Sequence, residues 1–178
     1  MTLNEGKELL SKNGISFETY EFDNEATYWH HTTQFPYTKN AKDCKVIILS
    51  ILSKNGNKNI ELQFNEVGNN FLFEELRFGS YCFEMFDSNE DTFVDDLLNH
   101  ILKIKSGYFA VIIVNDLKNK KWLGDTCFDL NNDDIFGRHD FERAIEQINK
   151  PKGLISKLLK TQICYEIYDW NTYHFVTK

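Results

Sequence analysis

The stretches CKVIILSIL (residues 44–52) and NIELQFNEV (residues 59–67) decide the fold of this 178-residue chain. Both are rich in the β-branched and aromatic residues that strands favour, and the connection SKNGNK has a glycine between two asparagines, which is typical of a hairpin turn. In the second stretch the apolar residues Ile60, Leu62 and Phe64 alternate with polar ones. Because successive side chains of a strand point to opposite faces, this alternation predicts an antiparallel sheet that is covered on one side.

Strands are also predicted on both sides of this hairpin. ISFETYEFD (residues 15–23) comes before it, and FLFEELRF (residues 71–78) and YCFEMF (residues 81–86) follow it after short turns. A capping-box pair, Thr2 and Glu5, precedes the first of these strands and predicts a short amino-terminal helix. The four strands from the hairpin onward are joined by short turns and therefore predict an antiparallel meander.

The strongest helical signal lies in SNEDTFVDDLLNHILKIKSG (residues 88–107). Ser88 is a good N-cap, the carboxylates come early and the lysines late, and apolar residues recur at helical spacing. Beyond this helix we expect strands over 108–116, 121–130, 162–170 and 173–177, and helices over 141–149 and 153–161. The sequence therefore predicts an α+β fold with a single domain, 1–178. Its mostly antiparallel twisted sheet combines the meander with a carboxyl-terminal hairpin and is packed by about three to four helices.

Composition excludes several classes of protein. Apolar residues make up 42% of the chain and aromatic residues 15%, so the sequence is not that of a disordered protein. No apolar run approaches the ~18 residues of a membrane span, and the amino terminus lacks the pattern of a secretion signal, so a cytoplasmic protein with no membrane partner is expected. The four cysteines show no C-x-x-C spacing, and we expect them to be reduced and structural, with no cofactor and no metal.

The negative charge of the chain is concentrated in segments. The net charge is −7, and the segment between Arg77 and Lys103 carries six carboxylates and no lysine or arginine. Such a field argues against nucleic acid as a partner and favours a basic protein. We expect the partner to be bound by acidic residues that steer it and by aromatic residues that it buries, namely Asp87, Glu90, Asp91, Asp95 and Asp96, with Tyr28, Trp29 and Trp122.

These features favour an acidic cytoplasmic protein-binding module. In size and charge, though in no motif, the chain is similar to the immunity proteins that bacteria make against their own toxins. That similarity implies an inhibitor that blocks a basic toxin through electrostatic complementarity. A structural adaptor domain is the plainer alternative.

An enzyme is a further alternative, because three similar strands each carry a carboxylate. CFEMFD, CFDLNN and CYEIYD place Glu84, Asp129 and Glu166 at matching positions. If these side chains met in one cleft, they would bind a divalent ion and assist hydrolysis. His30 and His31 are candidates for acid-base chemistry, although adjacent histidines rarely bind one metal. The chain has no G-x-S-x-G, P-loop or dinucleotide motif.

Overall fold

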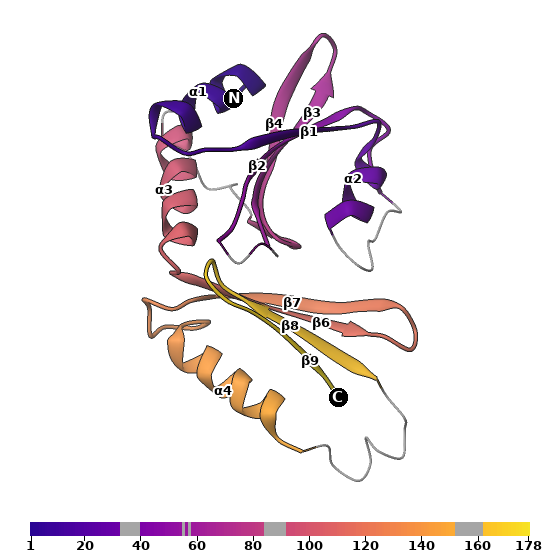
Figure 1. The fold of residues 1–178 in the computed structure, drawn as a ribbon, viewed down its shortest axis with the longest axis vertical. Helices are drawn as coiled ribbons and strands as arrows, with labels where there is room; N and C mark the ends of the chain where they lie inside the picture. Colours follow the sequence, from indigo (N-terminus) through magenta and orange to yellow (C-terminus); the bar gives the residue numbers. More distant parts are fainter. Residues whose placement is uncertain (33–39, 55, 57, 84–91, 152–161) are drawn as a thin grey trace. The chain divides into compact units, whose positions relative to one another are not determined.

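The computed structural model describes residues 1–32, 40–54, 56, 58–83, 92–151 and 162–178 (Figure 1). The chain forms two compact units, Met1–Ile104 and Lys105–Lys178. Each unit has an antiparallel sheet of its own, with five strands in the first sheet and four in the second. The predicted α+β class is confirmed, but the strands are divided between two sheets. That residues 1–178 act as a single domain stays a prediction.

The first unit is built on the predicted meander. Its elements are α1 (Leu3–Lys12), β1 (Glu18–Phe22), α2 (Glu25–Thr32), β2 (Val46–Ile51), β3 (Ile60–Val67), β4 (Asn70–Phe78), β5 (Tyr81–Phe83) and α3 (Phe93–Lys105). The sheet has the order β1-β2-β3-β4-β5, and every neighbouring pair is antiparallel. The predicted hairpin forms β2 and β3, and the stretch before it adds β1 at the edge.

Both faces of this sheet are covered. α1 and α3 lie on one face and α2 on the other (Figure 1). On the first face Leu62 and Phe64 are fully buried. On the second face Glu61, Gln63 and Asn65 are only 8%, 0% and 2% exposed. The expectation that only one side of the sheet is covered is therefore wrong, because α2 closes the polar face as well.

The second unit is a smaller sheet with one helix against it. Its described elements are β6 (Phe109–Asp116), β7 (Lys121–Asp129), α4 (Arg138–Asn149), β8 (Ile163–Tyr168) and β9 (Tyr173–Thr177). The sheet has the order β7-β6-β8-β9, and the predicted carboxyl-terminal hairpin forms β8 and β9. α4 contributes Ile148 to a core with Ile112, Phe128 and Ile167. The helix predicted over residues 153–161 lies outside the described residues.

The predicted helix over residues 88–107 is observed as α3. Its buried stripe is confirmed, because Leu97, Ile101 and Ile104 are fully buried. The predicted N-cap, Ser88, lies outside the described residues. Within the ranges given above, no helix is both long enough and apolar enough to cross a membrane.

Candidate functional site

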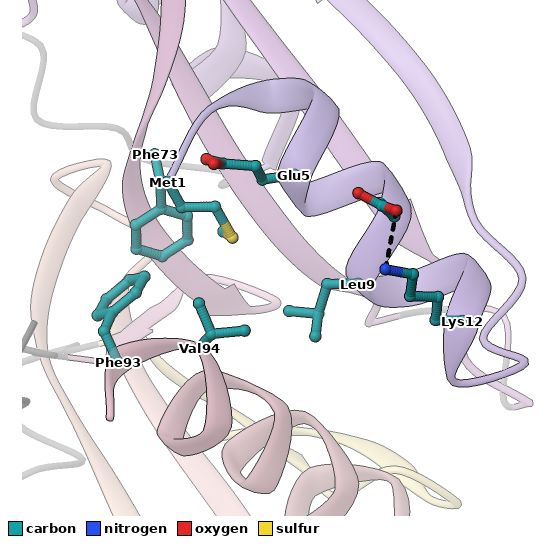
Figure 2. Close-up of a pocket in the computed structure, with 8 residues that line it drawn as sticks. Met1, Glu5, Leu9, Lys12, Phe73, Phe93 and Val94 are labelled. Carbon is teal, nitrogen blue, oxygen red and sulfur yellow. Dashed lines mark ion pairs between the residues drawn. The ribbon is translucent and has the colours of Figure 1, made fainter. Parts of the chain in front are cut away.

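A groove of about 760 Å³ lies in the first unit, between α1, β4 and the start of α3 (Figure 2). All three elements belong to the same compact unit. The groove has an apolar floor and a charged rim. Its lining residues are Met1, Glu5, Glu8, Leu9, Lys12, Phe73, Phe93 and Val94.

Aromatic rings connect the floor of the groove to the core of the unit. Phe73 from β4 and Phe93 from α3 meet edge to face with their ring centroids 5.3 Å apart. The centroid of the buried Phe64 ring lies 5.8 Å from that of Phe73. Leu9 is half-buried, and Val94 is 43% exposed. The groove therefore leaves apolar surface in contact with water, and covering such surface is favourable.

The wall formed by α1 is fastened to β4. Thr2 forms an isolated bridge with Leu72, and the Phe73 N–H donates to the Met1 carbonyl at 2.9 Å. The Thr2 hydroxyl accepts from the Glu5 N–H, and the Thr2 N–H donates to the Glu5 carboxylate at 2.7 Å. The predicted capping box is therefore confirmed. It fixes the beginning of α1 against the strand that carries the aromatic floor.

The rim of the groove carries charges of both signs. Hydrogen bonds from the backbone and the hydroxyl of Thr2 lower the pKa of the Glu5 carboxyl, so Glu5 stays ionised at neutral pH. Lys12 lines the groove, and Glu8 binds it with an N–O distance of 2.8 Å (Figure 2). The amino group of Met1, which also lines the groove, is a second cation, and its charge is a further cause of the lowered pKa of the Glu5 carboxyl. No ion pair of the described residues involves Glu5.

Two of the predicted acidic residues add negative charge along α3. Asp95 is exposed and directly follows Val94, and Asp96 accepts a hydrogen bond from the Thr92 hydroxyl at 2.9 Å. In the part of the chain that the structure describes, neither carboxylate pairs with a lysine or an arginine. The other acidic residues predicted to bind a partner lie outside the described residues, namely Asp87, Glu90 and Asp91.

The three aromatic residues expected at an interface have different environments. Tyr28 is fully buried on the inner side of α2, so it does not contact a partner at the surface, and that expectation is corrected. Trp29 follows it on the same helix and is half-buried. Trp122 is 44% exposed and belongs to β7 of the second unit. None of the three lines the groove.

The inner side of α2 instead holds hydrogen-bonded polar groups next to a small apolar cluster of Tyr28, Val46 and Ile48. The Tyr28 hydroxyl donates to the Glu61 carboxylate at 2.8 Å, and the Arg77 guanidinium carbon lies 5.7 Å from the centre of the Tyr28 ring. Glu25 accepts a hydrogen bond from the Gln63 amide at 2.8 Å. Burial raises the pKa of the Glu61 carboxyl, although Tyr28 and Arg77 act in the opposite direction. These contacts give the polar groups a structural role, in which they hold α2 on the polar face of the sheet.

Replacing Tyr28 with phenylalanine is expected to lower the free energy of unfolding by about 2 kcal/mol at neutral pH, because the buried Glu61 carboxylate loses its donor. The pKa of Glu61 is higher in the folded state, so its contribution to stability is fully present below pH 4.5 and is lost as the pH rises through the folded pKa. The cost of Tyr28→Phe falls mainly on the ionised form, so it should shrink toward pH 4.5. Urea unfolding at pH 4.5 and at neutral pH measures both values.

A matched control is available for this variant. The Tyr20 hydroxyl also donates to a glutamate, Glu18, but this pair lies at the surface. Tyr20→Phe should therefore change the free energy of unfolding by less than about 0.5 kcal/mol. Equal losses in the two variants, or a Tyr28→Phe cost independent of pH, would contradict the role assigned to the polar groups on the inner side of α2.

Two of the three carboxylates of the predicted hydrolytic site, Asp129 and Glu166, lie in the described residues, and they do not meet. Asp129 pairs across β6 with Phe109, whereas Glu166 pairs with Ile113 from the other side. The two positions are thus about 13 Å apart along the strand direction and two strand spacings apart across it, too far to bind one ion. Glu84 lies outside the described residues.

The carboxylates, histidines and cysteines considered for catalysis make ordinary structural contacts or are exposed. Asp129 accepts a hydrogen bond from the Asn131 N–H at 3.0 Å, and Glu166 accepts one from the Asn115 amide at 3.3 Å. His30 and His31 are exposed at the end of α2, and the His31 ring lies 5.5 Å from Phe22. No group of three histidine, cysteine or carboxylate residues able to hold a metal occurs among the residues described, and none of the four cysteines forms a disulfide.

Sequence reasoning identified the acidic residues of α3 but not the groove beside them. Leu9 and Phe73 read as ordinary core positions of a helix and a strand, and only the capping box hinted at how α1 is fixed. No known protein family, curated protein or solved structure matches this chain.

Proposed function

We propose that the protein is an acidic binding module that recognises a basic protein, in the manner of an immunity protein that blocks a toxin. The observation that carries this proposal is the position of Asp95 and Asp96 in the first turn of α3, the helix whose Val94 lines the apolar groove. Carboxylates attract and orient a cationic surface, while apolar surface supplies the contact area that holds it.

The charges of this region support an external cation as their partner. Glu5 and Asp95 take part in no ion pair of the described residues, and Lys12 is already bound by Glu8. Carboxylates that are not neutralised within the protein act on charges about 8 Å away at physiological ionic strength. The net charge of −7 repels acidic molecules and adds to the same attraction.

Replacing Asp95 and Asp96 together with asparagine is expected to slow association with a basic partner about tenfold at low salt, with little change in dissociation. The difference between variant and wild type should vanish at high salt, where ions screen the carboxylates. The partner is captured from a lysate of the producing cells, identified and purified. Surface plasmon resonance then measures both rate constants over a series of salt concentrations.

The matched control for this variant is Asp23→Asn with Asp43→Asn. Both aspartates are exposed, belong to the first unit and form no ion pair in the described residues. The control changes the net charge by the same amount at other positions, so it should slow association much less. Equal slowing by the two double variants would contradict the assignment of the site to α3. Association that does not depend on salt would contradict the proposed function itself.

A further inference from the structure

We infer that the groove between α1, β4 and α3 binds one face of an amphipathic helix from the partner, with leucine-like side chains in the groove and lysine or arginine beside it. This inference rests on the proposed function only for the sign of the partner's charge. The proposed function needs the carboxylates alone, whereas the inference needs the apolar lining as well.

The size and composition of the groove suit a segment of protein. Its volume of about 760 Å³ is large enough for several side chains and falls in the range of about 300–1,000 Å³ that is typical of ligand sites. Five of its eight lining residues are apolar, namely Met1, Leu9, Phe73, Phe93 and Val94. An apolar lining of this kind gains from covering apolar side chains and offers little to a small polar ligand.

The charges around the groove determine which charged residues the bound segment can carry beside its apolar face. Glu5 lies on α1 at one side of the groove (Figure 2), and Glu8 lines the groove from the same helix. Asp95 follows Val94 in the first turn of α3. Lys12 is held by Glu8, and the amino group of Met1 is a second cation at the groove, so the sum over these charges is −1 (three carboxylates and two ammonium groups). A cationic residue on the α1 side of an apolar face would therefore meet a carboxylate, and an anionic residue there would be repelled.

The backbone around the groove favours a helix over an extended peptide. An added strand needs free N–H and C=O groups at the edge of a sheet. At Phe73 the edge of the strand is already occupied, because β4 pairs with β3 on one side, and on the other the Phe73 N–H donates to Met1 and Leu72 forms a bridge with Thr2. A ligand in the groove therefore contacts the side chains that line it and does not add a strand to the sheet at Phe73. A helix satisfies its own backbone and presents side chains at i, i+3, i+4 and i+7, which is the recognition mode of such grooves.

Val94 provides the sharpest test of the inference. It lies in the first turn of α3, lines the groove and is 43% exposed, so its replacement removes apolar surface without opening the core. Leu102 is the matched control, because it lies on the same helix with the same exposed fraction, 43%, and does not line the groove. Circular dichroism of Val94→Ser and Leu102→Ser should match the wild type.

The probe is a fluorescein-labelled synthetic helix of about 14 residues, with leucine at i, i+3, i+4 and i+7 and lysine and alanine elsewhere. Fluorescence anisotropy measures its affinity for the full chain. Val94→Ser should weaken binding about tenfold, the loss expected when a valine-sized contact is removed, and Leu102→Ser should leave binding unchanged. A peptide with glutamate in place of lysine should bind at least about tenfold more weakly than the lysine peptide.

The other possible outcomes contradict the inferred helix, the proposed function, or both. If Val94→Ser and Leu102→Ser have equal effects while Asp95→Asn still weakens binding, the groove is not the site and the proposed function stands. If the lysine and glutamate peptides bind equally well, both the proposed function and the inferred partner are contradicted. If the lysine peptide does not bind at all, the inferred helix is overturned, and the salt dependence with the captured partner tests the proposed function independently.

Discussion

Replacing Phe64 with alanine is expected to lower the free energy of unfolding by about 4 kcal/mol, the largest loss we expect from a single truncation in the first unit. The Phe64 side chain is fully buried, and it packs between α1 and the ring of Phe73. Truncation removes its apolar contacts and leaves a cavity that the surrounding sheet can close only in part. Urea unfolding followed by circular dichroism measures the loss.

Gly6 supplies a second test of the same contact. A Cβ atom added at Gly6 would lie 2.6 Å from Cζ of Phe64, which is closer than packed atoms allow. In the wild type, Gly6→Ala should therefore destabilise by about 1 kcal/mol, since overpacking outweighs the gain in helix propensity. In the Phe64→Ala background the methyl group enters the cavity, and Gly6→Ala should stabilise by about 1 kcal/mol. If Gly6→Ala has the same effect in both backgrounds, α1 is not packed on Phe64 as described.

The fold class could be predicted because local patterns and tertiary contacts agree in most strands. The alternation of Ile60, Leu62 and Phe64 predicts the buried face of β3, and these residues are fully buried. The opposite face could not be predicted, since burial of Glu61 depends on the distant Tyr28, which donates to it. A sequence pattern shows which residues share a face, but it does not show which segment returns to cover that face.

The candidate site likewise has one part that the sequence predicts and one that it does not. The acidic start of α3 could be predicted, because charge and helical periodicity are properties of one continuous segment. The groove could not, because it combines Leu9 of α1, Phe73 of β4 and Val94 of α3. Each of these residues is consistent with ordinary core packing in its own element. Only their arrangement in space leaves a cleft, and no single stretch of sequence records that arrangement.

Replacing Gly137 with alanine is expected to destabilise the second unit by about 3 kcal/mol, because the backbone leaves no room for a side chain there. An added Cβ would lie 2.1 Å from the Asn132 carbonyl oxygen and 2.7 Å from that of Asp134. Both oxygens belong to the backbone of the loop before α4, and both are hydrogen-bonded in it: the Gly137 N–H donates to Asp134 and the Arg138 N–H to Asn132. Relieving the clash therefore breaks the bonds that shape the loop and position the start of α4.

Gly68→Ala separates this steric effect from the cost of an unusual backbone conformation. Gly68 has φ of 62° but no atom within 4 Å of an added Cβ, whereas Gly137 has an ordinary φ of −89°. Gly68→Ala should therefore cost only about 1–2 kcal/mol, the penalty of the left-handed region. Amide hydrogen exchange of β3 and β6 reports the loss in each unit separately. If Gly137→Ala leaves the exchange of β6 unchanged, the close approach of the Asn132 carbonyl does not constrain the loop, and α4 is positioned by its apolar contacts with Ile112 and Phe128 alone.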